Sequence, residues 1–295
     1  MTAPILVVGG TGNVGREVVA RLLEAGVPVR ALVRSLKRAA GVLGEGVELV
    51  KGDLDDLTTL GPALQGVEKV FVCSPADPLL PERERRLAHA AAAAGARHLV
   101  KVSMLIAAAD SPIHAAQWHA ESEAAIEGAG LGFTFLQPQF YLQNLLGFAP
   151  GIVAEGTISA PMGEGRVSMV DVRDVADVAA RVLLDEGHIG QRYLITGPES
   201  VTFGELAARL SAGIGREVSY IPADGEETRA AMVEAGVPTW FVDDLVGLYR
   251  FYAEGGGDWL SDAVAVVAGH TGRTVDHFAA DYAFAFQPTE EPAAE

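Results

Sequence analysis

Seven consecutive residues near the N-terminus have the spacing of a phosphate-binding turn. They follow an apolar run and precede a stretch with helical periodicity. Early glycines in such a turn allow positive φ angles and let the backbone approach a pyrophosphate, and the last glycine lets the helix pack closely against the strand. The N–H groups at the start of the helix then favour negative charge. In this setting the pattern predicts dinucleotide binding, the alternative being a glycine-rich turn without a ligand. The seven residues are Gly9, Gly10, Thr11, Gly12, Asn13, Val14 and Gly15.

Basic residues at the end of the second apolar run indicate which dinucleotide is bound. The run Val29–Val33 ends in Arg34, with Lys37 and Arg38 just beyond, and no acidic residue stands there. An acid at this point would bond the ribose 2′-hydroxyl of NAD. A guanidinium instead binds a 2′-phosphate and stacks on adenine. We therefore predict NADP(H) as the cofactor, the alternative being that these cations only form the solvated start of a helix.

Two later turns are predicted to add cofactor contacts. Asp53 and Leu54 follow the third apolar run, where the adenine would lie, although Asp53 is equally suited to cap the next helix. Cys73, Ser74 and Pro75 follow the fourth run, beside the expected crevice. Cys73 is the only cysteine, so it forms no internal disulfide, and without a basic neighbour in sequence it is expected to be a small buried residue and not a nucleophile.

The elements that must position these turns alternate along the first half of the chain. Short, continuously apolar runs are typical of strands covered on both faces, and the segments between them have helical periodicity. Such alternation predicts an α/β fold, a doubly wound parallel sheet of the Rossmann type. The expected strands are Ile5–Val8, Val29–Val33, Val47–Val50, Lys69–Val72, Leu99–Val102 and Phe133–Leu136, and the expected helices are Val14–Ala25, Leu57–Leu64, Pro81–Ala94 and Ala115–Glu127.

The second half is less regular and predicts a smaller, interleaved C-terminal α/β substrate domain. Strands at Val167–Val170 and Arg192–Ile195, with a helix at Val172–Leu184 between them, are expected to return to the main sheet. A short helix is expected at Phe140–Phe148 and a strand at Val218–Ile221. We expect a nucleotide-binding domain over residues 1–140 and 166–197, a substrate domain over 141–165 and 198–287, and a disordered tail over 288–295.

Charge and composition narrow the range of partners. The net charge is −17, and residues 151–295 carry 24 acidic against 9 basic groups. Such a field disfavours nucleic acids and anionic membrane surfaces. No signal peptide and no apolar run of membrane-spanning length is present, so a soluble cytoplasmic protein that acts on a small molecule is expected, as a monomer or a homodimer. Histidines are scattered and predict no metal site, and neither a Gly-x-Ser-x-Gly elbow nor a P-loop occurs.

Several of these segments together resemble the NmrA-like branch of the atypical short-chain dehydrogenases/reductases, over about residues 4–285. The resemblance implies a Rossmann fold that binds NADP(H), and an activity as a quinone, dye or isoflavone-type reductase. The branch also contains redox sensors without activity. The segments are Gly9–Gly15, Arg34, Gly52–Asp56, Ser103, Leu136–Pro138 with Phe140, Gln143 and Asn144, and Met169–Ala176.

The same resemblance indicates which residues are candidates for catalysis. Active members of the wider superfamily carry Tyr-x-x-x-Lys, and here His119 takes the Lys position and Ala115 the Tyr position. Ser103 matches the family's serine, and with His119 and Pro138 it is expected beside the cofactor. His119 either supplies a proton or only bonds the ribose, and Tyr141 is a second candidate proton donor. Hydride transfer remains feasible without the Tyr because the cofactor carries the difficult chemistry.

Aromatic residues are candidates for the substrate pocket. They would form a wall for a flat, apolar or quinone-like acceptor, although aromatic side chains are more often plain core. Two other functions stay open: an NADP(H)-sensing regulator without turnover, and an enzyme that retains NADP in a non-redox reaction, such as a cyclase, dehydratase or epimerase. The candidate substrate residues are His114, Trp118, Phe140, Tyr141 and Trp240.

Overall fold

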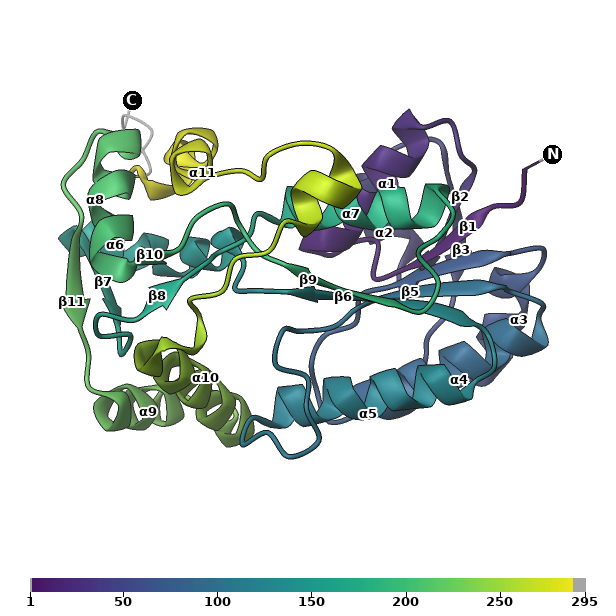
Figure 1. The fold of residues 1–295 in the computed structure, drawn as a ribbon, viewed down its shortest axis with the longest axis horizontal. Helices are drawn as coiled ribbons and strands as arrows, with labels where there is room; N and C mark the ends of the chain where they lie inside the picture. The colour runs from purple at the N-terminus through teal and green to yellow at the C-terminus, as the bar shows by residue number, and fades with distance from the viewer. Residues whose placement is uncertain (1, 289–295) are drawn as a thin grey trace, which may run out of the picture. The chain divides into compact units, whose positions relative to one another are not determined.

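The computed structural model describes residues 2–288, which form two compact units (Figure 1). Of the described residues, the first unit comprises 2–138, 172–195 and 262–270, and the second comprises 139–171, 196–261 and 271–288. Both units are therefore discontinuous in sequence. Apart from residue 288, the tail expected at 288–295 lies outside the described residues.

A parallel sheet of seven strands forms the centre of the first unit, in the order β3-β2-β1-β4-β5-β6-β9. The order reverses between β1 and β4, where Ile5 pairs with Val29 on one side and with Lys69 on the other. The predicted doubly wound sheet is thus confirmed, with its switch point between these two strands. The strands are β1 (Ile5–Val8), β2 (Val29–Val33), β3 (Val47–Lys51), β4 (Lys69–Val72), β5 (His98–Val102), β6 (Gly132–Pro138) and β9 (Gln191–Ile195).

Helices cover both faces of this sheet, as Figure 1 shows. α1, α2 and α7 lie on one face and α3, α4 and α5 on the other, while η4 packs on α7. Because both faces are covered, Leu6, Val7, Val70 and Phe71 are fully buried, which explains the uninterrupted apolar runs. The helices are α1 (Asn13–Glu24), α2 (Leu36–Leu43), η1 (Leu57–Thr59), α3 (Leu60–Leu64), α4 (Leu80–Ala93), α5 (His114–Gly128), α7 (Val172–Leu184) and η4 (Val264–Ala268).

The second unit combines short strand pairs with helices around its own apolar core. β7 pairs in parallel with β11, and β8 pairs in antiparallel fashion with β10. Phe203, Leu206 and Phe278 are fully buried in this core. Its elements are η2 (Leu142–Phe148), α6 (Ala149–Glu155), β7 (Thr157–Ala160), β8 (Arg166–Val167), β10 (Val201–Thr202), α8 (Phe203–Ile214), β11 (Ser219–Pro222), α9 (Gly225–Glu234), α10 (Thr239–Phe251), η3 (Tyr252–Gly256), α11 (Val275–Asp281) and η5 (Ala283–Phe286).

One strand assignment is wrong. The run Val167–Val170 was expected in the main sheet, but only Arg166–Val167 forms a strand, and it pairs with β10 in the second unit. Val167 and Met169 are buried in that unit's core instead. The strand expected at Arg192–Ile195 does join the main sheet, as β9 beside β6.

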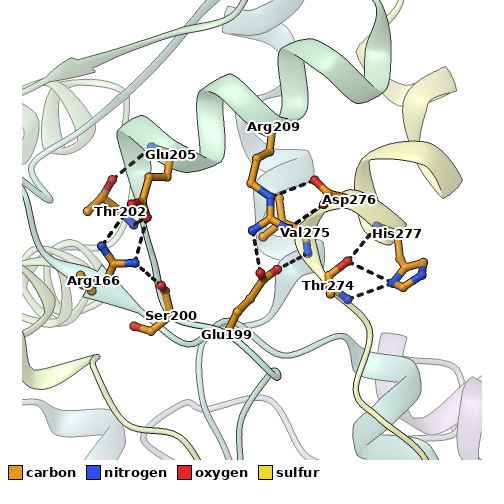
Figure 2. Close-up of polar contacts among 10 residues, drawn as sticks. All are labelled: Arg166, Glu199, Ser200, Thr202, Glu205, Arg209, Thr274, Val275, Asp276 and His277. Carbon is orange, nitrogen blue, oxygen red and sulfur yellow. Dashed lines mark hydrogen bonds and ion pairs between the residues drawn. The ribbon is translucent and has the colours of Figure 1, made fainter.

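Ion pairs and helix caps join α8 to α11 inside the second unit (Figure 2). Arg209 of α8 binds Glu199 at 2.7 Å and Asp276 of α11 at 2.7 Å. The other carboxylate oxygen of Glu199 accepts a hydrogen bond of 3.0 Å from the Val275 N–H, at the first residue of α11. Glu199 thus satisfies both the Arg209 cation and a backbone donor that a helix start would leave unpaired.

Among residues 2–288, no helix combines the length and the apolar character needed to cross a membrane.

Candidate functional site

The glycine turn is held tightly against the connection that follows β4. Gly9 has a φ of +84°, and a Cβ added there would lie less than 3.0 Å from the Cys73 carbonyl oxygen. A Cβ added to Gly15 would overlap the Gly9 carbonyl in the same way. Cys73 also donates its N–H to the Val8 carbonyl at 3.1 Å. Both glycines are therefore required by the close approach of three backbone segments.

The first turn of α1 presents its N–H groups without a side-chain cap. Gly12 is the N-cap residue and offers no side chain to accept them. Its own N–H donates to the Gly9 carbonyl at 3.0 Å, which closes the turn, and both Gly12 and Asn13 are exposed. An uncapped helix start of this kind is a site for an anion, and the space left by the missing side chains suits a pyrophosphate.

Arg34 lies exposed just past β2, and no hydrogen bond engages its side chain within residues 2–288. Its nearby acid, Asp55, is bound instead by Nε and Nη2 of Arg83, at 2.8 and 2.7 Å. Arg83 thereby lowers the pKa of Asp55. Beyond Arg34, Ser35 caps α2 by accepting the Arg38 N–H, so the basic stretch is also a helix start. The Arg34 guanidinium keeps its donors available for a phosphate.

The turn after β3 is organised by its own side chains. The Asp53 carboxylate accepts the Asp55 N–H at 3.1 Å, and the Asp53 N–H donates to the Thr59 hydroxyl at 3.0 Å. The residue that caps η1 is Asp56, whose carboxylate accepts the Thr58 N–H. The alternative in which Asp53 caps this helix is therefore wrong, because the cap lies three residues later.

The turns after β4 and β5 contain buried hydroxyls without partners. The Ser74 and Ser103 side-chain oxygens have no hydrogen-bond partner in the described chain. The Ser103 N–H is used, since it donates to the Leu136 carbonyl at 2.7 Å, so only its hydroxyl is left over. Buried polar groups are normally paired, and exceptions gather at functional sites. These hydroxyls lie where parallel α/β sheets bind ligands, outside the carboxyl ends of the strands.

Cys73 does not have the character of a nucleophile. Desolvation, with a smaller contribution from the Glu84 carboxylate, raises the pKa of its thiol to about 12. The thiolate is therefore disfavoured at neutral pH.

A buried polar cluster lies between α4, β5 and α5, and we refer to its four residues as the buried quartet. The Lys101 ammonium of β5 forms an ion pair with the Glu84 carboxylate of α4, and both side chains are fully buried. Nζ of Lys101 lies 3.1 Å from Nδ1 of His119, on α5. The hydroxyl of Ser122, also on α5, donates to Glu84 at 2.5 Å. Of these four residues, only His119 was anticipated from the sequence.

The environment of His119 bears on the choice between its two predicted roles. Desolvation, and then the positive charge of Lys101, hold the pKa of the imidazole well below its usual value of 6.5. The ring is therefore neutral at pH 7, which favours hydrogen bonding over proton donation by an imidazolium. A signal for the missed partners was present in the sequence, because Lys101 interrupts the apolar run Leu99–Val102 and a buried lysine requires a counter-charge.

The aromatic candidates divide between the units. In the first unit His114 and Trp118 lie one turn apart on α5, with ring centroids 6.0 Å apart. In the second unit, Phe140 is buried and packs edge-on against Tyr252, while Trp240 packs edge-on against Phe241 of α10. Phe140 thus belongs to the core of its unit. Tyr141 is half-buried and bridges to Val170. The predicted aromatic wall stays a prediction.

Gln139, which directly follows β6, was not singled out from the sequence. Its Oε1 accepts the Tyr252 hydroxyl at 2.8 Å and the Phe140 N–H at 3.1 Å. Because a backbone N–H can only donate, the amide orientation is fixed. Its buried Nε2 has no partner in the described chain.

Asp174, Asp177 and His270 gather potential metal ligands within 4.8 Å of one another in the first unit. Arg21 binds Asp177 at 2.8 Å, and His270 lies 3.2 Å from the other oxygen of the same carboxylate. The Arg21 cation already compensates this charge, so we interpret the cluster as an ion-pair network between α1, α7 and the segment after η4.

Comparisons with known proteins identify the class. The NmrA-like family model matches residues 1–279, and the chain belongs to this family, as the resemblance predicted. The chain is 41% identical over 285 residues to an NAD(P)H azoreductase of Xenophilus azovorans, covering 96% of this chain and 99% of that protein.

Solved structures agree with this placement. The NADPH-dependent quinone oxidoreductase of Escherichia coli in complex with NADPH superposes with a TM-score of 0.85 at 29% identity, covering 94% of this chain and 99% of that one. The triphenylmethane reductase of Citrobacter sp. with NADP(H) superposes with a TM-score of 0.84 at 30% identity, covering 95% and 99%.

Proposed function

We propose that this chain is a cytoplasmic NADPH-dependent reductase that delivers hydride to an apolar, aromatic or quinone-like acceptor. The observation that carries the proposal is the uncapped glycine turn, held against the β4 connection by Gly9 and Gly15, with the Arg34 guanidinium unengaged beyond β2. The similarity to an azoreductase, a quinone oxidoreductase and a dye reductase supports the acceptor class.

The first unit is assigned to the cofactor. The backbone N–H groups at Thr11–Asn13 bind the pyrophosphate, and Arg34 and Arg38 bind the 2′-phosphate. Asp53 and Leu54 border the adenine, while Cys73, Ser74, Pro75 and Pro138 line the other half of the site. The second unit, with Phe140, Tyr141 and Trp240, is assigned to the substrate. When bound, NADPH supplies the hydride.

The unpaired hydroxyl of Ser103 and the imidazole of His119 are assigned to orient the cofactor or the acceptor. Both donate hydrogen bonds in their neutral forms. Each is placed by regular structure, Ser103 by the end of β5 and His119 by α5, which keeps the donors in fixed positions.

The test of this proposal is Arg34→Asp, with Arg97→Asp as the matched control. Arg97 is exposed and precedes β5, at the amino edge of the sheet, so its substitution makes the same charge change away from the cofactor. We expect Arg34→Asp to weaken NADPH binding at least about tenfold, equivalent to about 1.4 kcal/mol, and to leave NADH binding unweakened. The control retains wild-type affinity in calorimetry.

The acceptor class is tested separately, by the loss of NADPH absorbance with a panel of quinones and azo and triphenylmethane dyes. Oxidation of NADPH by members of this panel supports the reductase. NADPH binding without oxidation by any of them would point to a sensor instead, and product formation without net cofactor change would point to a non-redox enzyme.

A further inference from the structure

The buried quartet contains more polar chemistry than the packing of α4, β5 and α5 requires. Lys101 and Glu84 are fully buried, and a buried ion pair contributes little net stability compared with apolar residues of similar volume. Glu84 also keeps one carboxylate oxygen without a partner in the described chain. Because burying these charges costs free energy and adds little stability, we infer that the quartet has a function. The contacts of His119 indicate what that function is.

The hydrogen-bond roles within the quartet follow from which groups can donate. An ammonium has only N–H donors and no acceptor. Lys101 therefore donates to Glu84 and, across 3.1 Å, to Nδ1 of His119. The Ser122 hydroxyl donates to the same oxygen of Glu84 and so stabilises the carboxylate that pairs with the Lys101 ammonium. Since Nδ1 accepts a hydrogen bond, the proton of the neutral ring is on Nε2.

The second ring nitrogen is left for another partner. Nε2 makes no hydrogen bond within residues 2–288. His119 is 7% exposed to solvent, whereas its partner Lys101 is fully buried. The two nitrogens of an imidazole point to opposite sides of the ring, so a ring bound at Nδ1 by a buried lysine directs Nε2 away from that lysine.

We propose that Lys101, held by Glu84, is a positioning residue that fixes His119 as a neutral ring with its proton on Nε2, a constant hydrogen-bond donor in the proposed reductase site. Its chemical use rests on the proposed function: a neutral N–H stabilises negative charge on an acceptor oxygen without giving up its proton. The product anion then takes its proton from water, and His119 needs no reprotonation between turnovers.

The charges around the ring agree with a fixed neutral state. Lys101 on β5 faces it with a positive charge, which opposes protonation. Glu84 on α4 is engaged by Lys101 and Ser122, and the Cys73 thiol beyond β4 is uncharged at neutral pH. On α5 itself, Glu123 lies one turn on from His119, but it accepts from Gln137 at 3.1 Å and lies 3.5 Å from Arg192. The charge of each of these two carboxylates is thus already compensated by a cation, Lys101 for Glu84 and Arg192 for Glu123.

The direct test is nitrogen NMR of protein labelled with ¹⁵N in its histidine rings. The signals of His119 are assigned by their loss in His119→Gln. In the wild type we expect one neutral tautomer, protonated at Nε2, which persists from about pH 8 to about pH 5. A proton on Nδ1, or an ordinary titration in this range, would overturn the proposal. This measurement needs no cofactor and no turnover, so it stands apart from the test of the reductase.

The causal role of Lys101 is tested with the double variant Lys101→Met, Glu84→Gln, which removes both charges together and so avoids a lone buried ion. We expect His119 to titrate closer to its ordinary range and to populate both tautomers. His98 provides an internal control, because it lies at the opposite end of β5 with its own partner, Thr134. Lys101→Arg, which keeps a donor, should keep the tautomer.

A kinetic measurement adds a second readout. The dependence of kcat on pH should be flat across about pH 5.5–8 in the wild type and should gain a step in the double variant. An unchanged His119 spectrum in the double variant would show that Lys101 is only structural. If the double variant does not fold, the tautomer of the wild type still decides the proposal.

Discussion

Three glycines of the first unit separate the cost of a positive φ angle from the cost of a steric overlap. Gly26 has a φ of +71° and nothing within 4 Å of an added Cβ. Gly15 has helical backbone, but its added Cβ overlaps the Gly9 carbonyl. Gly9 combines a φ of +84° with an overlap on the Cys73 carbonyl. Alanine at these positions therefore samples the angle alone, the overlap alone, or both.

The expected losses of unfolding free energy follow from these differences. A left-handed backbone costs an alanine about 1–2 kcal/mol, which is the whole expectation for Gly26→Ala. The overlapped atoms at Gly9 and Gly15 belong to the backbone and cannot rotate away, which places the overlap near the upper end of the usual range, about 3 kcal/mol. Gly15→Ala regains about 1 kcal/mol of helix propensity, for a net loss of about 2 kcal/mol. Gly9→Ala should lose about 4–5 kcal/mol.

Urea unfolding followed by circular dichroism measures these losses, and calorimetry with NADPH measures the consequence for binding. Gly26→Ala should bind NADPH like the wild type, because this glycine lies away from the turn. Gly9→Ala and Gly15→Ala should bind it more weakly, because either overlap displaces the N–H groups of the turn. The reasoning fails if Gly9→Ala is no less stable than Gly26→Ala, since the turn would then not be pressed against the β4 connection.

Two further predictions concern stability. Desolvation, followed by the charges of Lys69 and His188, lowers the pKa of His98 from 6.5 to about 4. The unfolded chain therefore binds this proton first, and the unfolding free energy should fall by about 2–3 kcal/mol as pH drops from about 6.5 to 4. Urea titrations of the wild type and His98→Gln at both ends of this range measure the effect, and an equal pH dependence in the two proteins would contradict the assignment. Glu199→Ala should cost about 1–2 kcal/mol, because it removes one of the two carboxylates that bind Arg209 and leaves the Val275 N–H unpaired. Glu199→Gln should cost less because an amide oxygen still accepts that N–H. Equal losses in urea unfolding would argue against the cap.

The strands of the main sheet were predictable because burial on both faces leaves a direct trace in the sequence. The run Val29–Val33 matches β2, and Val172–Leu184 matches α7 residue for residue. Burial does not say which sheet a run joins, and this explains the error at Val167–Val170, which is apolar because it lines the core of the second unit. Helix α2 was not delimited, because it is only eight residues long and Ala39 is the only one of them that is buried.

The parts of the candidate site also differ in how far the sequence could predict them. The glycine turn is local, so spacing alone located it. The environment of His119 depends on Lys101 and Glu84, which lie 18 and 35 positions away in sequence on two other elements. Which side chains meet there is decided by the rotation of α4 and α5 on the sheet, and residue spacing does not specify that rotation. The sequence could therefore name the histidine but not its protonation state.

The discontinuity of both units has a consequence for dissecting the protein. A fragment that ends at Pro138 keeps six strands of the main sheet but loses β9 and α7. Strand β6 would then become an edge strand, and its unpaired backbone N–H and C=O groups could pair with another extended chain. The apolar residues of α1 that pack against α7 would be exposed to water. Such a fragment should aggregate on expression. Exchanging the second unit between related proteins therefore requires replacing several internal segments, because a single truncation point does not separate the two units.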